Sequence, residues 1–198
     1  MKFLLARHAS TDWSAEGRWQ GSTDRHLTAI GEREAVQAAR NMLQSQWRPE
    51  VLTSLSTRSV ETGRVICDFL GTALKTIDGI QERSLGEWEG LTGAEVEALW
   101  PGAVSAWKAG QLDGPPGGET DVEVAERAMI ALRREVSSRT ESCLLVITHA
   151  GVLHALDHVT SAGYRDYPPL WARSCRTAFS ELEFENSTLV NLLSQRSV

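Results

Sequence analysis

The sequence predicts an α/β fold, a three-layer α-β-α sandwich with a mostly parallel central sheet and an antiparallel edge strand. Short apolar runs of strand length alternate along the chain with amphipathic stretches of helical period. Two of these runs, residues 2–6 and 143–148, lead directly to histidine-bearing motifs at His8 and His149. Buried parallel strands deliver the residues that follow them to one edge of a sheet. We therefore expect a functional site at the carboxyl ends of the strands.

The first half of the chain supplies three of the expected strands. Residues 2–6 form the first strand and residues 7–27 a polar loop. A helix follows from Thr28, its N-cap, to about residue 45, with Val36, Ala39 and Leu43 at helical spacing on its inner face. The pattern then predicts a strand over 51–54, a helix over about 59–70 and a weak strand over 73–77.

The second half contains a Gly-, Trp- and Pro-rich excursion and the remaining core elements. We expect short helices over 93–100 and 104–109 inside this lid-like excursion, which covers about residues 84–118 of a single domain spanning 1–198. A long helix over 121–138, a buried strand over 143–148 and a helix over 151–159 follow. The pattern ends in a hairpin of strands over 176–185 and 187–193, which would add the antiparallel edge.

Composition excludes several classes of function. The chain has 198 residues, of which 41% are hydrophobic and 23% charged, and its net charge is −6. Negative charge disfavours nucleic-acid binding, which needs cations that neutralise phosphates. No apolar run approaches the roughly 20 residues of a membrane helix, and the run at residues 1–6 is too short for a secretion signal. We therefore expect a cytoplasmic protein, and a homodimer remains open.

Five residues near the predicted strand ends carry the candidate chemistry: Arg7, His8, Arg58, Glu82 and His149. Guanidinium groups bind phosphoryl oxygens, and an imidazole can attack phosphorus and hold the phosphoryl group covalently. A carboxyl group can protonate the leaving oxygen and later deprotonate water. Fixed cations stabilise the transition-state charge, so we expect neither a metal nor another cofactor.

The motifs around these residues resemble those of the histidine phosphatase superfamily, which includes the phosphoglycerate mutases. Arg7-His8-Ala9-Ser10-Thr11 is similar to the Arg-His-Gly signature of that family. The other similar motifs are Gly17–Gly21 with Leu27-Thr28, Ser54 to Thr62 around Arg58, Glu82 to Gly90, Gly117 to Thr120, and Thr148-His149-Ala150-Gly151. They occur in the family's order and cover nearly the whole chain, so the resemblance also implies a phosphoglycerate mutase-like fold.

The resemblance implies a role for each candidate. His8 is the nucleophile that forms a phosphohistidine, and Glu82 is the proton donor and acceptor. Arg7, Arg58 and His149 hold the phosphoryl oxygens.

The resemblance also implies a substrate-binding set around the catalytic group. It consists of Arg7, Ser14, Gln20, Gly21, Arg58, Glu82, His149 and the backbone of Ala150, with Trp88, Trp100 and Trp107 at the mouth of the pocket. Two positions depart from the family pattern. Ala9 replaces a glycine and would be strained if its φ were positive. Ser14 replaces a frequent asparagine and bears on substrate affinity.

The loop at residues 17–21 resembles the phosphatase branch of the family more than the mutases. This implies a metal-independent phosphomonoesterase, a histidine acid-type phosphatase. Its substrate would be a small phosphorylated metabolite: a sugar phosphate, a phosphoglycerate or a nucleoside-type phosphate such as α-ribazole phosphate. Because Glu82 must be protonated to donate, we expect an acidic to neutral pH optimum.

Two alternatives stay open. A phosphoglycerate mutase would move the phosphoryl group between hydroxyls, but the family's mutases tend to carry larger inserts than the excursion at 84–118. A non-catalytic module that binds phosphorylated ligands is motivated by Ala9 alone.

Overall fold

The described residues form a six-stranded sheet in the order β3-β2-β4-β1-β5-β6. The computed structural model describes residues 2–46, 48–137, 143–160, 179–185 and 188–192. The strands are β1 (Lys2–Arg7), β2 (Glu50–Thr53), β3 (Leu74–Thr76), β4 (Cys143–Thr148), β5 (Phe179–Glu185) and β6 (Thr188–Leu192). β3, β2, β4 and β1 run parallel to one another, as the sequence predicted for most of the sheet. β5 pairs antiparallel with β1, and β6 pairs antiparallel with β5.

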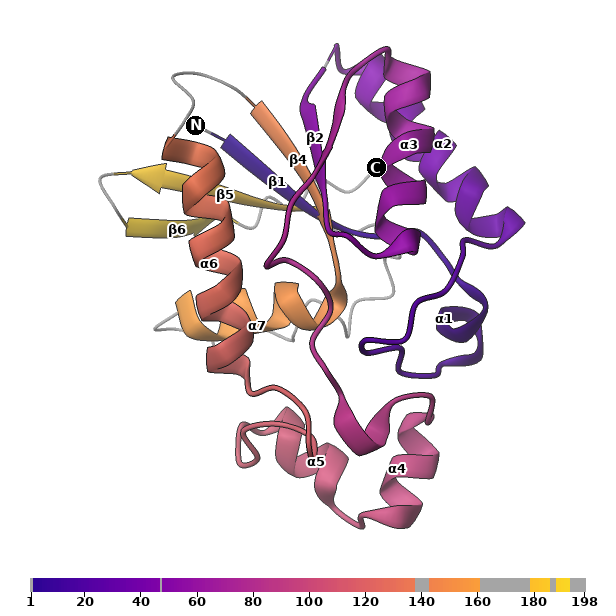
Figure 1. Ribbon diagram of the computed structural model, residues 1–198, viewed down its shortest axis with the longest axis vertical. Coiled ribbons are helices and arrows are strands. Elements are labelled where there is room, and N and C mark those ends of the chain that lie inside the picture. Colours follow the sequence, from indigo (N-terminus) through magenta and orange to yellow (C-terminus); the bar gives the residue numbers. More distant parts are fainter. Residues whose placement is uncertain (1, 47, 138–142, 161–178, 186–187, 193–198) are drawn as a thin grey trace.

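Helices cover both faces of the sheet (Figure 1), which confirms the predicted α/β sandwich. α2 (Ala29–Gln44) and α3 (Thr57–Leu70) lie on one face, and α6 (Asp121–Ser137) and α7 (Ala150–Thr160) on the other. Successive strand residues point to opposite faces. Leu5 accordingly packs with the α6 and α7 side, whereas Ala6 packs with the α2 and α3 side.

The helix α2 begins where the sequence predicted, because the Thr28 side chain accepts a hydrogen bond from the Gly31 backbone N–H at 3.1 Å. Its buried stripe is Gly31, Ala35, Ala38, Ala39 and Met42. The expectation that Leu43 faces inward was wrong, since 39% of Leu43 is exposed. A Cβ on Gly31 would lie 2.2 Å from the Ser10 carbonyl oxygen, so α2 packs too closely for a stripe of large side chains.

The excursion contains α4 (Gly93–Leu99), α5 (Ala103–Lys108) and a 3-10 turn, η1 (Gly86–Trp88). It has an apolar cluster of its own, in which Trp88 and Val96 are fully buried and Trp19 and Trp107 pack against them. The polar loop before α2 contains a short helix, α1 (Asp12–Glu16), that the sequence did not predict. Five residues are too few to display a helical period, and α1 is instead set by a capping box between Thr11 and Ser14.

The order of the strands locates a crevice. β1 and β4 are neighbours, but the chain after β1 leads to α2 on one face and the chain after β4 leads to α7 on the other. Such a reversal opens a crevice at the carboxyl ends of the two strands. Within the ranges described, no helix combines the length and apolar character needed to cross a membrane.

Candidate active site

Two histidines from strands far apart in the sequence meet in the crevice. His8 directly follows β1, and its backbone N–H donates to the Thr148 carbonyl, the last residue of β4, at 3.0 Å. His149 follows β4, and its ring centroid lies 5.2 Å from that of His8. Both side chains are buried. The structure thus brings together the two histidines that the sequence singled out.

The hydrogen bond of the His8 ring determines which nitrogen can react. Nδ1 lies 2.8 Å from the carbonyl oxygen of Ala9. A carbonyl oxygen only accepts, so Nδ1 carries the proton and the neutral imidazole keeps its lone pair on Nε2. Nε2 is therefore the nitrogen that is able to act as a nucleophile.

The surroundings keep both histidines neutral. Burial, together with the charges of Arg7 and Arg58, holds the pKa of His8 well below its usual value. Burial and the neighbouring His8, Arg58 and Arg7 likewise hold the pKa of His149 well below its usual value. A neutral His8 is the form with a free lone pair, so its ring is able to act as a nucleophile even in mildly acidic solution.

Ser54 orients the second histidine. Its Oγ lies 2.7 Å from Nε2 of His149 and accepts the Ser56 backbone N–H at 3.3 Å. The Ser54 hydroxyl can donate to Nε2 or accept from it; when it donates, Nδ1 of His149 carries the ring proton. Nδ1 is buried with no partner among the described residues, so in that tautomer it is a donor available to a phosphoryl oxygen.

Arg58 lies in the first turn of α3 and is only 1% exposed. Its Nη1 donates to the Thr23 carbonyl at 2.9 Å and to Asp24 Oδ1 at 3.3 Å, and its Nη2 donates to the Gly21 carbonyl at 3.0 Å. Burial lowers the pKa of Arg58 from its usual value, but a guanidinium stays charged at any physiological pH. These contacts fix a cation beside the two histidines.

Glu82 is held at the N-terminus of α7. Its Oε1 accepts the backbone N–H groups of Gly151 and Arg83, both at 3.0 Å. A Cβ on Gly151 would lie 2.4 Å from that oxygen, so only glycine allows Glu82 to come this close. Glu82 and the histidines His8 and His149 consequently share the same end of the sheet.

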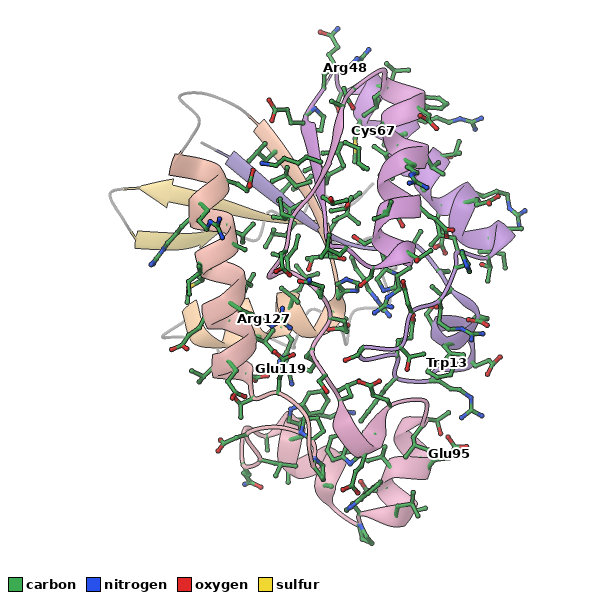
Figure 2. All side chains as sticks on the ribbon, in the orientation of Figure 1. Trp13, Arg48, Cys67, Glu95, Glu119 and Arg127 are labelled. Carbon is green, nitrogen blue, oxygen red and sulfur yellow. The ribbon has the colours of Figure 1, made fainter. Side chains whose placement is uncertain are left out.

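Arg127 on α6 holds the Glu82 segment from behind. Its guanidinium donates to the carbonyls of Gly79 and Gln81 at 2.9 Å and to that of Glu82 at 3.3 Å. It also pairs with both carboxylate oxygens of Glu119, at 2.8 and 2.9 Å, and the two side chains lie together in Figure 2. Arg127 therefore fixes the backbone that carries Glu82.

The crevice opens into a cavity of about 350 Å³, a size suited to a small metabolite. Arg7, His8 and Glu82 line it, as do the expected substrate residues Ser14, Gln20 and Ala150. The lining contains four cationic side chains, Arg7, Arg18, Arg83 and Lys108, against one carboxylate, Glu82. The cavity of this acidic protein is thus locally positive, which favours an anionic ligand.

Other expected substrate residues lie outside the cavity lining. Arg58 and His149 are buried behind it, and Gly21 supports Arg58 through its carbonyl. Of the three tryptophans expected at the mouth, Trp107 lines the cavity, whereas Trp88 and Trp100 belong to the apolar cluster of the excursion. Trp19 lines the cavity as well.

Ala9 is not strained. Gln46 is the only residue other than glycine with a positive φ in the described part of the chain. The Ala9 backbone N–H donates to Thr62 Oγ1 at 3.0 Å, and its carbonyl accepts the proton of His8. Alanine is thus compatible with the backbone that orients the His8 ring.

Glu89 joins the loop that carries Gln20 and Gly21 to the excursion. Its carboxylate accepts the Ser22 N–H at 2.9 Å, the Thr23 hydroxyl at 3.2 Å and the Leu85 N–H at 3.1 Å. Two backbone bonds, Trp19 N–H to the Leu91 carbonyl and Gly90 N–H to the Trp19 carbonyl, continue the connection. The two segments form one wall of the cavity.

Sequence reasoning missed Asp24, Glu89 and Arg127 as supports of the site. Asp24 lies in the polar loop before α2 and pairs with Arg58. No local spacing marks such residues, because each acts on a segment distant in sequence. His154 and His158 are four positions apart on α7, a spacing at which two helical histidines can share a metal. The His154 Nδ1 instead faces Asp121 Oδ2 at 3.5 Å, and the His158 side chain is outside the described residues. The described side chains contain no group of three or more potential metal ligands.

Comparison with known proteins points to one family. A model of the histidine phosphatase superfamily (branch 1) matches residues 3–194. The glucosyl-3-phosphoglycerate phosphatase of Mycolicibacterium vanbaalenii is 30% identical over 163 residues, which cover 78% of this chain and 72% of that protein. The metal-independent phosphoserine phosphatase of Arabidopsis thaliana is 31% identical over 159 residues, covering 78% and 66% respectively.

Solved structures agree with these matches. A mycobacterial glucosyl-3-phosphoglycerate phosphatase in complex with VO3 superposes with a TM-score of 0.84 at 25% identity. The superposition covers 97% of this chain and 96% of the mycobacterial one.

Proposed function

This chain belongs to the histidine phosphatase superfamily, and we propose on that premise that it hydrolyses its substrate through a phosphohistidine intermediate on His8. Membership confirms the resemblance predicted from the sequence motifs. The chain is a phosphoric monoester hydrolase that acts on a phosphorylated metabolite. We propose below a role for each residue of the site and a class of substrate.

The observation that carries the proposal is the hydrogen bond from His8 Nδ1 to the Ala9 carbonyl. It leaves the lone pair on Nε2, in a buried site flanked by Arg7, Arg58 and His149. An unprotonated nitrogen surrounded by cations and donors suits attack on a phosphoryl group.

In the first step, His8 Nε2 attacks phosphorus and the bond from phosphorus to the ester oxygen breaks. The carboxyl group of Glu82 gives its proton to that leaving oxygen, so an alcohol departs. Arg7, Arg58 and Nδ1 of His149 stabilise the charge spread over the three phosphoryl oxygens.

In the second step, the carboxylate of Glu82 takes a proton from water, and the hydroxide attacks the phosphohistidine. The P–N bond breaks, inorganic phosphate leaves, and His8 and Glu82 return to their starting forms. No step requires a metal ion, since the protein supplies the cations.

Two relatives suggest the class of substrate. Glucosyl-3-phosphoglycerate and phosphoserine, the substrates that the names of these phosphatases denote, are both phosphate esters with a carboxylate on a three-carbon unit. The cavity volume of about 350 Å³ and its cationic lining support a small anionic phosphomonoester. We extend the proposal to a single catalytic domain over residues 1–198, located in the cytoplasm, with the excursion at 84–118 forming part of the substrate pocket.

The test is a phosphate-release screen over phosphorylated metabolites with EDTA present, comparing the wild type with His8→Ala. We expect one group of small anionic esters to stand out and the variant to be inactive. Equal release by wild type and variant would contradict the assignment of His8. Interconversion of 2- and 3-phosphoglycerate without phosphate release would instead support the mutase alternative.

A further inference from the structure

The peptide group between Ala9 and Ser10 holds the His8 ring, and it is hydrogen-bonded at both ends. Its carbonyl oxygen, which belongs to Ala9, lies 2.8 Å from His8 Nδ1. Its N–H, which belongs to Ser10, donates to Oε2 of Glu34 at 2.9 Å. The other carboxylate oxygen of Glu34, Oε1, accepts the Ser10 hydroxyl at 3.0 Å. A carboxylate on α2 is therefore connected to the His8 ring through a single peptide group.

The close packing of α2 against Ser10 makes this contact possible. The Ser10 carbonyl accepts the Thr28 backbone N–H at 3.0 Å and the Thr28 hydroxyl at 3.3 Å. Gly31 has no side chain that would keep α2 away from this carbonyl. Glu34 follows Gly31 by three positions, so the two residues lie on the same side of the helix. The carboxylate of Glu34 consequently reaches Ser10 from the next turn of α2.

The same segment is fixed from α3. The Ala9 backbone N–H donates to Thr62 Oγ1 at 3.0 Å, and the Thr62 hydroxyl donates to the Arg58 carbonyl at 2.7 Å. Ala9 and Ser10 are both buried. In such surroundings hydrogen bonds are electrostatically stronger than in water, and successive bonds polarise one another. The negative charge of Glu34 therefore makes the Ala9 carbonyl a stronger acceptor.

The proposed reaction needs a strong acceptor at this carbonyl. When Nε2 of His8 bonds to phosphorus while Nδ1 keeps its proton, the ring becomes positively charged, and it is neutral again when the P–N bond breaks. Burial, Arg7 and Arg58 lower the pKa of His8, whereas the hydrogen bond to Ala9 raises it. Of these influences, the hydrogen bond to Ala9 is thus the one that stabilises the charged ring, and Glu34 strengthens it.

We propose that Glu34 is a positioning residue for the reaction. Through the peptide group between Ala9 and Ser10, it holds the His8 ring in the reactive tautomer and stabilises the positive charge that the ring gains during phosphoryl transfer. Glu34 is not among the residues that line the cavity, so it acts through His8 and not on the substrate. The inference rests on the proposed function, because it requires His8 to be the nucleophile.

The variant Glu34→Gln separates the charge of this side chain from its shape. The amide oxygen of glutamine can accept the Ser10 N–H, and its NH2 group can donate to the Ser10 hydroxyl, so the hydrogen bonds persist without the negative charge. We expect kcat/KM for p-nitrophenyl phosphate to fall about fivefold, since a charged acceptor contributes more than a neutral one. This quantity reports the steps up to release of nitrophenolate, during which the ring becomes charged.

Two further measurements distinguish this role from a merely structural one. The inhibition constant of inorganic phosphate should stay at its wild-type value in Glu34→Gln, because phosphate binds without charging the ring. The proton NMR resonance of His8 Nδ1–H, identified by its absence from His8→Gln, should move upfield because the hydrogen bond to Ala9 becomes weaker. Glu32→Gln, which removes an exposed carboxylate from the same helix, is the matched control and should alter none of the three quantities.

The inference is overturned if Glu34→Gln keeps the wild-type kcat/KM or the wild-type Nδ1–H resonance. It is also overturned if the inhibition constant of phosphate rises as much as kcat/KM falls, since Glu34 would then only hold the loop, or if Glu32→Gln loses as much activity. When hydrolysis depends on His8 but not on Glu34, this inference alone fails. If the wild type releases phosphate from no phosphomonoester, the proposed function fails and this inference fails with it.

Discussion

Ser54 is the residue on which the orientation of His149 depends. Replacing Ser54 with alanine removes the hydroxyl that lies 2.7 Å from Nε2, so the ring can rotate or change its tautomer. We expect Ser54→Ala to lower kcat/KM about tenfold, which corresponds to the loss of one hydrogen bond. Steady-state kinetics measure this, and Ser54→Thr, which keeps a hydroxyl, should recover part of the loss. Unchanged kinetics in Ser54→Ala would contradict the role of Ser54.

The buried histidines make stability depend on pH. The pKa values of His8 and His149 are lowered by burial in the folded state, so between those values and about 6.5 only the unfolded chain binds the protons. Stability therefore falls as pH decreases below about 6.5, by about 1.4 kcal/mol per pH unit for each histidine. Urea unfolding at pH 7 and pH 5 measures this change.

The control for that measurement is His8→Gln, which should show a smaller decrease in stability between pH 7 and pH 5 than the wild type. The change in unfolding free energy with pH must be compared between the two proteins, because His26 affects this change with the opposite sign. Its pKa is raised by its contact with Glu61. Identical slopes in the two proteins would contradict the assignment of a neutral, buried His8.

At the residue scale, the sequence predicts the reacting groups better than their supports. His8, Arg58 and His149 stand in recognisable motifs, and the structure brings them together. The tautomer of His8 and the environment of Arg83 depend on contacts between distant segments. No local pattern encodes such contacts, so they could not be predicted.

At the scale of elements, α6 positions Glu82 through Arg127. Arg127→Gln removes the charged fork that holds three carbonyls and Glu119, so the segment from Gly79 to Glu82 is no longer fixed. A displacement of about 1 Å at a catalytic group can cost about a hundredfold in rate. We expect kcat for an alkyl phosphate to fall by up to that amount.

The leaving group distinguishes this effect from general damage. p-Nitrophenolate leaves without a proton, so hydrolysis of p-nitrophenyl phosphate should fall less than hydrolysis of an alkyl phosphate in Arg127→Gln. Arg134→Gln, on the exposed face of the same helix, should change neither rate. Equal losses for both substrates would show that Arg127 does not act through Glu82.

The N-terminus of α7 makes a second contribution through Gly151. A methyl group there would lie 2.4 Å from Glu82 Oε1 and 2.9 Å from Cγ of Arg83. We therefore expect Gly151→Ala to displace Glu82 and to lower kcat for alkyl phosphates by about tenfold or more. Kinetics and circular dichroism together measure this, and wild-type kinetics in a folded Gly151→Ala protein would refute it.

The helical period in the sequence predicted the bounds of the helices more reliably than it predicted which residues form their buried faces. The long helix and the short helices of the excursion lie where the sequence predicts them. The predicted inner face of α2 was partly wrong, since Leu43 is exposed, and Phe69 of α3 is exposed as well. Small residues and polar site residues occupy the buried stripe of these helices, and hydrophobicity alone does not identify them.

At the scale of the whole molecule, the fold brings cationic side chains together around one cavity, although the protein has a net charge of −6. The neighbouring strands β1 and β4 bring His8 and His149 together although 141 positions separate these two residues in the sequence. Alternating strands and helices made this arrangement predictable from the sequence. The substrate was not predictable, because the cavity wall is assembled from loops that have no regular pattern.

The central claim is that His8 carries the phosphoryl group. The most direct measurement mixes Glu82→Gln with p-nitrophenyl phosphate, quenches the reaction under alkaline conditions that preserve phosphohistidine, and locates the modification by peptide mass spectrometry. Glu82→Gln lacks the base that activates water, so the intermediate should accumulate. The account predicts one phosphoryl group on the peptide that contains His8. A phosphoryl group on the His149 peptide, or none on any peptide during turnover, would contradict it.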